Sequence, residues 1–161
     1  MNNALVPLVR TLDLNTRLFL NALDGVDDSV ATSRPNESTN HIAFIACHLV
    51  EARHYLGNTV GHESSSPFKA LEGARGIDDI QEFPTVDEIR SAWKVISERL
   101  SSHLATLGDA DLEKELERPF PIEAGNTTLA AITFLIEHDS FHIGQLGFLR
   151  RFFGLDALKY S

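Results

Sequence analysis

The feature that most constrains the fold is the helical spacing of apolar residues along four long segments of the chain. In each segment an apolar side chain recurs every three or four residues, which builds one stripe along an amphipathic helix. Little of the remaining sequence has the alternation typical of a strand. The pattern therefore predicts an all-α fold, a four-helix bundle. The four predicted helices cover residues 4–23, 38–60, 85–107 and 127–153.

Capping residues and helix breakers predict where these helices begin and end. Pro7 fits only in the first turn of the first helix, because a proline deeper inside would break it. Ser38 or Thr39 can accept a hydrogen bond from the first turn of the second helix. Thr85, followed three residues later by Glu88, forms a capping box for the third. The other ends are marked by Gly25, Gly61, Gly108, Thr127 or Thr128, and Gly154.

The connections between the helices differ in length and character. Residues 26–39 are expected to form a loop, and residues 61–84 a connection of roughly 24 residues, which is long for a compact domain. Such a segment is typical of a functional loop or of a crossover along a bundle. Residues 109–116 predict a short acidic helix, and residues 120–126 an extended turn or hairpin. At this length we expect residues 1–161 to form one domain.

Charge and cysteine content exclude several classes of function. The chain has 14 Lys and Arg against 23 Asp and Glu, a formal net charge of −9. This balance argues against binding nucleic acids or anionic membranes. The uncharged stretches are too short to span a bilayer, and the first residues lack the pattern of a signal peptide. A single cysteine, Cys47, argues against a disulfide framework, so we expect a cytoplasmic protein.

Three histidines are the candidates for chemistry. His138 and His142 are four residues apart, so they project from one face of the fourth helix, and Gln145 follows on the same stripe. Because that stripe is apolar, we expect them to face the interior of the bundle. His48 lies in the middle of the second helix on a similar stripe. Three neutral imidazoles can bind one metal ion and leave some of its coordination positions open. This ligand set does not distinguish zinc, nickel, manganese and iron.

The alternative is a metal-free bundle in which these histidines are core residues. A single histidine on an apolar face is usually neutral and hydrogen-bonded. A cluster of three would then need three such partners, and the sequence has few carboxylates on the inward stripes to supply them. This favours a metal ion.

Two sequence motifs resemble the DinB-like (YfiT-type) family of four-helix bundles. Residues 40–51 read NHIAFIACHLVE and place His48 before a leucine, as the second helix of that family does. Residues 137–146 read EHDSFHIGQL and match the His-x-x-x-His-x-Gly-Gln motif of its last helix. The resemblance covers essentially the whole chain. It implies an up-down-down-up bundle with a long crossover after the second helix, and homodimers. It also implies one divalent metal, often zinc or nickel, on His48, His138 and His142.

Two further residues are candidates for a role beside the metal. Glu51, three residues after His48, is interpreted as a fourth ligand, an acceptor for a ligand imidazole, or a solvated carboxylate. Gln145 is interpreted as a residue that orients a ligand imidazole or a metal-bound water, or as a packing residue beside Gly144. Cys47 is rotated by about 100° from His48 and is expected to be a core thiol.

Most other polar and aromatic residues are assigned to simpler roles. His41 lies more than 10 Å along the helix from His48 by the helical rise, so we expect it near the helix cap. Trp93 and Tyr55 are expected in the core, although either could line a pocket. The residues expected at the surface are His54, His62, His103, Glu137, Asp139, Arg53, Arg90, Arg150 and Arg151, although the arginines could also receive an acidic substrate group.

The resemblance suggests a metal-dependent transferase that uses a low-molecular-weight thiol and a small-molecule electrophile. The three histidines would hold the metal that activates the thiol. A metal-dependent hydrolase is an alternative, with Glu51 as its candidate general base. A non-catalytic, stress-related module with a structural metal is a further alternative.

Overall fold

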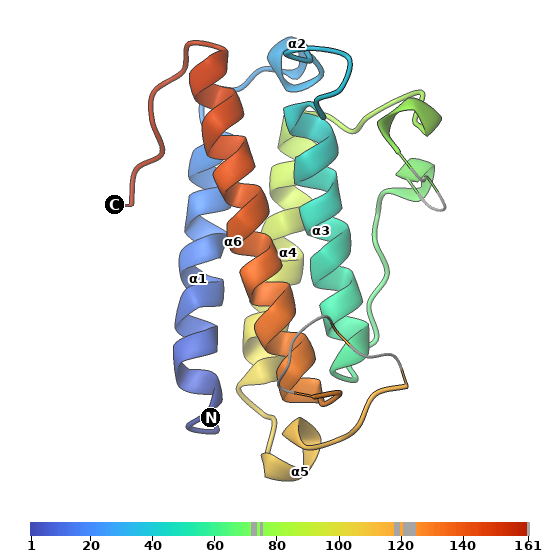
Figure 1. Ribbon diagram of the computed structural model, residues 1–161, viewed down its shortest axis with the longest axis vertical. Coiled ribbons are helices and arrows are strands. Elements are labelled where there is room, and N and C mark those ends of the chain that lie inside the picture. Colours follow the sequence, from blue (N-terminus) through green and yellow to red (C-terminus); the bar gives the residue numbers. More distant parts are fainter. Residues whose placement is uncertain (72–73, 75, 118–119, 121–124, 161) are drawn as a thin grey trace.

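The computed structural model contains a bundle of four long helices (Figure 1). The described residues are 1–71, 74, 76–117, 120 and 125–160. The long helices are α1 (Leu5–Ala22), α3 (Ile42–Thr59), α4 (Val86–Leu104) and α6 (Thr128–Phe152). The short elements are α2 (Asp28–Ala31), α5 (Asp109–Leu112) and two 3₁₀ turns, η1 (Lys69–Leu71) and η2 (Ile77–Asp79). No helix among the described residues is both long and apolar enough to cross a membrane.

The long helices run up-down-down-up, which confirms the predicted topology. Helix α6 packs against α1 and α3, and α4 packs against the same two helices from the other side. Helices α3 and α4 run in the same direction, so the chain must return from one end of the bundle to the other between them. In Figure 1 this crossover rises along the outer side of α3, away from α1, from the lower end of α3 to the upper end of α4.

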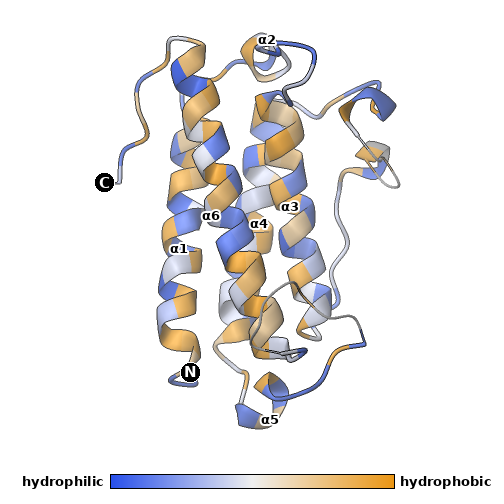
Figure 2. Ribbon diagram, in the orientation of Figure 1, coloured by the Kyte–Doolittle hydropathy of each residue, from blue (hydrophilic) through white to orange (hydrophobic). Residues whose placement is uncertain are grey.

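Two apolar clusters fill the interior, one towards each end of the bundle. In the first, the rings of Phe19 and Trp93 stack with their centroids 4.0 Å apart. Trp93 is fully buried, as the sequence predicted. The second cluster includes Leu56, Leu100 and other residues that follow the predicted stripes. The outward faces of the helices carry a mixture of polar and apolar residues (Figure 2).

A buried polar layer lies between these clusters, and it corrects two predictions. Arg53 and Asp139, which the sequence placed at the surface, are 1% and 2% exposed and form an ion pair of 2.9 Å. The Arg53 guanidinium also donates to Thr16 Oγ1 at 2.7 Å and to the Leu12 carbonyl at 3.3 Å, and it lies 3.5 Å from the centre of the Trp93 ring. Burial raises the pKa of Asp139, and the Arg53 charge opposes that rise. Arg53 thus connects all four long helices.

Most helix ends agree with the sequence, but the start of α3 does not. The capping box at Thr85 and Glu88 is present, and Thr127 caps α6. Helix α3 begins later than predicted, because the His41 Nδ1 accepts the first-turn hydrogen bond from the Phe44 N–H at 3.0 Å. The two predicted caps, Ser38 and Thr39, instead donate hydrogen bonds to the Asn36 side chain. His41 is therefore a cap residue, as expected.

The acidic helix near residue 110 is shorter than predicted. Helix α5 ends at Leu112, and the following segment extends so that Glu115 forms an isolated antiparallel bridge with Thr127. Most of the predicted turn or hairpin at residues 120–126 lies outside the described residues.

The crossover is held against α3 by polar side chains. His54, predicted to be exposed, is 9% exposed, and its Nδ1 lies 2.5 Å from Ser64 Oγ. Asn58 exchanges two hydrogen bonds with the Ser64 backbone, at 2.8 and 2.9 Å. The Ser66 hydroxyl donates to the Glu51 carboxylate. Tyr55, expected in the core or at a pocket, is 50% exposed and lines a hollow between α3 and the crossover together with His54 and Ser64.

Four other surface predictions are also wrong. Arg90 is half-buried, and its guanidinium donates to the Leu23 carbonyl at 3.2 Å. His62 and His103 are half-buried, with ring centroids 5.2 Å apart. Arg150 is 4% exposed, because its guanidinium donates to the carbonyls of Asn21 and Ala22 at the end of α1 and to Asp156. These contacts stabilise the C-terminal end of α1, where unpaired carbonyls accumulate.

Candidate metal centre

Helices α3 and α6 bring three distant imidazoles together. His48 projects from the middle of α3, and His138 and His142 project from consecutive turns of α6. The Nε2 atoms of His48 and His138 are 3.0 Å apart, and one ring nitrogen of each histidine lies within 4.8 Å of the others. The ring centroids are separated by 4.4 to 4.9 Å. All three residues predicted as metal ligands therefore meet at one place.

The cluster lies at the rim of the bundle and not in its interior, which corrects the prediction. His48 is exposed, and His138 and His142 are half-buried. The most buried stripe of α6 runs through Asp139 and Ile143, one residue further along the chain. One residue corresponds to about 100° of rotation, which turns the histidines from the centre of the bundle to the groove between α3 and α6. A ligand in solution can therefore reach them.

Gln145 determines which nitrogen of His142 is available. The Gln145 Oε1 lies 2.7 Å from His142 Nδ1, and a carbonyl oxygen can only accept a hydrogen bond. His142 Nδ1 therefore carries the proton, and its Nε2 has the free lone pair. A hydrogen bond of this kind fixes the tautomer and the orientation of a ligating imidazole.

The environment of His48 and His138 favours neutral imidazoles. Burial, followed by the nearby His142 and His48, lowers the pKa of His138 from 6.5 to about 4. Burial also lowers the pKa of His48, and His142 adds to this effect. Metal ions bind the neutral form of histidine, so His48 and His138 need not lose a proton near neutral pH to bind one.

The donor set and its spacing fit a divalent cation. Two nitrogens that bind one zinc ion at about 2.0–2.1 Å are about 3.3 Å apart at a tetrahedral angle and about 2.9 Å apart at a right angle. The His48–His138 separation of 3.0 Å falls between these values. The buried His138 Nδ1 has no hydrogen-bond partner among the described residues, so the ring has no competing hydrogen bond that would turn it away from His48.

Two other residues near His48, Glu51 and Cys47, are not part of the histidine cluster. The Glu51 carboxylate accepts a hydrogen bond from Ser66 and does not belong to the cluster formed by the three imidazoles. Its proposed catalytic role stays a prediction. Cys47 is fully buried, as expected for a core thiol. Burial and the Glu51 charge both raise the Cys47 pKa, so this thiol is not a nucleophile.

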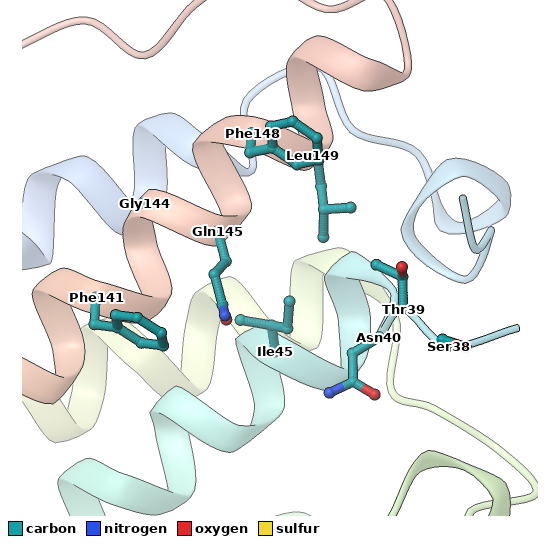
Figure 3. Close-up of a pocket in the computed structure, with 9 residues that line it drawn as sticks. All are labelled: Ser38, Thr39, Asn40, Ile45, Phe141, Gly144, Gln145, Phe148 and Leu149. Carbon is teal, nitrogen blue, oxygen red and sulfur yellow. The ribbon is translucent and has the colours of Figure 1, made fainter. Parts of the chain in front are cut away.

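A pocket of about 500 Å³ opens beside the cluster, between α6 and the start of α3 (Figure 3). Gln145 points from α6 across the pocket towards Ile45 on α3. The Phe141 ring, at one edge, has its centroid 5.1 Å from that of His142. The lining combines apolar side chains with uncharged polar groups: Ser38, Thr39, Asn40, Ile45, Phe141, Gly144, Gln145, Phe148 and Leu149.

Sequence reasoning found the histidines but missed this pocket. Ile45 lies one turn before His48, and Phe141 and Phe148 flank Gln145. The spacing of the two phenylalanines on the outward side of the fourth helix was a signal, because that side should be polar in a bundle helix. Asn40 carried no signal, since a loop asparagine is common.

The fold and the site define a class of protein: a four-helix bundle with an open three-histidine site between its second and last long helices. The family model of the DinB superfamily matches residues 11–146. The chain therefore belongs to the DinB superfamily. A search of curated proteins found no match to the chain.

A solved structure shows the same fold. The chain is similar to the crystal structure of a DinB-like protein, YjoA, from Bacillus subtilis, with a TM-score of 0.65 and 17% sequence identity. The match covers 98% of this chain and 96% of that chain. The family, together with the histidine cluster, fits a metal-binding helical protein.

Proposed function

We propose that His48, His138 and His142 bind one divalent metal ion, with zinc or nickel as the first candidates. The observation that carries this proposal is the convergence of the three imidazoles, with two Nε2 atoms 3.0 Å apart. A divalent metal bound by three neutral imidazoles lowers the pKa of a thiol or water in its open position. Gln145 holds the ring of His142 in the required orientation.

We propose further that the protein is a transferase that uses a low-molecular-weight thiol as co-substrate. Cys47 is the one cysteine of the chain, and it is buried with a raised pKa. A thiol for the reaction must therefore come from a second molecule. The exposure of His48 at the rim leaves room for such a molecule to approach the cluster.

The pocket beside the cluster is the proposed site for the electrophile. Its walls are formed by Ile45, Phe141, Phe148 and Leu149, which suit an apolar body. The polar lining groups are amides and hydroxyls, so the electrophile is expected to be uncharged where it enters the pocket. Gln145 can contact both the substrate and His142, which would position the electrophile next to the thiol.

Metal-dependent hydrolysis is the second candidate, and Glu51 is the observation that favours it. Its carboxylate lies one turn after His48 on α3 and is oriented by the Ser66 hydroxyl. A carboxylate at this position could accept a proton from a water molecule. A structural metal is less well supported, because structural sites are usually closed by four protein ligands.

Two measurements test the proposal. Elemental analysis of protein prepared without an affinity tag should find about one zinc or nickel per site, and His142→Ala should lose it. His103→Ala is the matched control, because it removes an imidazole outside the cluster. Transfer of small thiols to apolar electrophiles is then assayed on metal-loaded protein.

The two results separate the parts of the proposal. Equimolar metal in His48→Ala would contradict the ligand set. Metal binding with thiol transfer and hydrolysis both at background would contradict the enzymatic proposal and support a non-catalytic module. We also propose that the protein acts in the cytoplasm, because its one cysteine is maintained as a buried thiol.

A further inference from the structure

A second cavity, larger than the pocket beside His142, lies between α4 and the crossover. Its volume is about 1070 Å³, at the upper end of the size of ligand pockets. One wall is a stripe of α4, and the other comes from two stretches of the crossover near Phe68 and Phe83, with His54 of α3 beside them. The three histidines of the candidate metal centre do not line it.

The middle of this cavity is apolar. Phe68 is 8% exposed and Phe83 is half-buried, so the crossover presents two aromatic rings to the cavity. On the facing helix, Val95 is 48% exposed although it is a β-branched apolar residue. An apolar body bound here would remove this surface from water, which is favourable. The apolar side chains of the lining are Pro67, Phe68, Leu71, Phe83, Pro84, Ala92 and Val95.

One end of the cavity is positively charged. Arg99 lies one turn after Val95 on α4, is exposed, and forms no hydrogen bond or ion pair with any described residue. Lys69 of the crossover lines the cavity too, and it also lines the adjoining hollow together with His54. Burial, followed by the charges of Arg99 and His62, lowers the pKa of His54. Arg99 is therefore close enough to this imidazole for its charge to act on it.

His54 supplies a buried polar atom without a partner at the same end. The residue is 9% exposed, and its Nδ1 lies 2.5 Å from Ser64 Oγ. Its Nε2 has no hydrogen-bond partner among the described residues, although buried polar groups are usually paired. A carboxylate beside Arg99 would select the tautomer with the proton on Nε2, in which the Ser64 hydroxyl donates to Nδ1. The end of the cavity then offers one hydrogen-bond donor and one cation to the same anion.

The opposite end is acidic, which limits the ligand to one negative charge. Glu82, Asp87 and Glu88 line this end. The Glu88 carboxylate is held in place, because it accepts hydrogen bonds from the Thr85 N–H and hydroxyl, both at 2.8 Å. Glu88 precedes Arg99 by 11 residues on α4, which is about 16 Å by the helical rise. A second carboxylate at the far end of a ligand would therefore meet like charges.

We propose that this cavity binds a small organic acid that has one carboxylate and an apolar body no longer than about 16 Å. The carboxylate lies between the Arg99 guanidinium and His54 Nε2. The body covers Val95 and the two phenylalanines of the crossover. The site is separate from the histidine cluster, so the inference does not depend on the proposed metal or on the proposed transferase activity.

Titration calorimetry with octanoate and octanol tests the charge of the ligand. The two probes share one hydrocarbon chain and differ in the carboxylate. Octanoate should bind with a dissociation constant below about 1 mM, and about fivefold more tightly than octanol. Arg99→Gln should bind the two probes equally. Lys94→Gln is the matched control, because it removes an exposed cation of the same helix that does not line the cavity.

Three results of this titration would overturn the proposal. One is octanoate binding that does not saturate below about 5 mM, which would show that no site is present. Another is octanol that binds the unmodified chain as tightly as octanoate. The third is an equal loss of octanoate affinity in Lys94→Gln and Arg99→Gln, which would show a general effect of charge.

Two further variants and a chelator test the location of the ligand. Val95→Glu should weaken octanoate more than tenfold, because it places a carboxylate in the apolar wall; the side chain is exposed, so the variant should fold. Phe148→Ser changes the pocket beside His142 and should leave the affinity unchanged. His142→Ala and a chelator should also leave it unchanged, whatever becomes of the proposed metal. Octanoate that still binds Val95→Glu, or that loses affinity in Phe148→Ser, in His142→Ala or with the chelator, would overturn the proposal.

Discussion

The buried ion pair between Arg53 and Asp139 gives the most decisive prediction about stability. Replacement of Arg53 by methionine removes a charge whose partner is 2% exposed. The hydroxyls that accept from Arg53 keep other contacts, because Thr16 also bonds the Leu12 carbonyl and Ser97 also bonds a backbone carbonyl of its own helix. The main damage is therefore one buried carboxylate without its partner.

The expected cost follows from this geometry. Loss of one member of a buried pair costs about 3–5 kcal/mol, because the other charge stays desolvated. Methionine retains much of the volume of arginine and can contact the Trp93 ring through its sulfur, so no large cavity adds to the cost. Asp139→Leu should cost a similar amount, since it leaves the guanidinium of Arg53 unpaired.

The double variant distinguishes this explanation from simple loss of packing. With Met at position 53 and Leu at position 139, this site holds no buried charge, so the free energy of unfolding should return to within about 1–2 kcal/mol of the original. Urea unfolding followed by circular dichroism at 222 nm measures all four proteins, with a chelator present throughout. Additivity of the two single effects within about 0.5 kcal/mol would refute the reasoning.

The dependence on pH provides a second check on the Arg53→Met variant. Burial already raises the pKa of Asp139, and without Arg53 nothing on the facing helix opposes that rise. The folded state then binds a proton more tightly than the unfolded state, so stability increases as the pH falls towards the carboxyl pKa. The deficit of Arg53→Met should therefore shrink between about pH 7.5 and pH 5. A deficit that is constant with pH would show that the carboxylate is not the cause.

Three further predictions concern other parts of the molecule. A metal ion at one hundred times its dissociation constant should stabilise the protein by about 2.7 kcal/mol. Thermal unfolding should show no such gain for His142→Ala. Titration calorimetry should show that Gln145→Ala binds the metal about 10–100-fold more weakly. Burial lowers the pKa of His41 below 6.5, so the folded state binds protons less well than the unfolded state. Acidification below about pH 6.5 should therefore reduce stability, because the protonated His41 no longer accepts the capping hydrogen bond. His41→Asn keeps an acceptor at every pH, so its melting temperature should fall less between about pH 7.5 and pH 5, and an equal fall would contradict the capping role. A Cβ at Gly147 would lie 2.6 Å from Leu158 Cδ1, so Gly147→Ala should displace the C-terminal segment and increase its proteolysis, and Gly147→Ala with Leu158→Ala should reverse the increase.

Much of the fold follows from local sequence signals. The spacing of apolar residues predicted the four long helices, because each helix must bury one stripe whatever its neighbours are. Thr85 and Glu88 predicted the start of α4, since a capping box involves only residues within one turn. The start of α3 was missed because Thr39 has the preferred chemistry of a cap but bonds Asn36, and His41 takes the capping role.

Contacts between distant helices were less accessible from the sequence. Arg53 and Asp139 are 86 residues apart, and nothing local reveals that they pair across the core. The grouping of His48, His138 and His142 was indicated by spacing and by the family motifs. Their position at the rim was not, because a shift of about 100° around α6 separates a buried residue from a residue in the groove.

Because the three histidines lie at the rim of the bundle, the residues that would bind a metal are not the ones that form the packed core. The apolar clusters and the Arg53 layer do not include any of the three imidazoles, so the polypeptide can fold before the proposed metal ion binds. An exchange of one metal for another needs no opening of the core. Replacement of one of these histidines should leave the apolar clusters and the Arg53 layer intact.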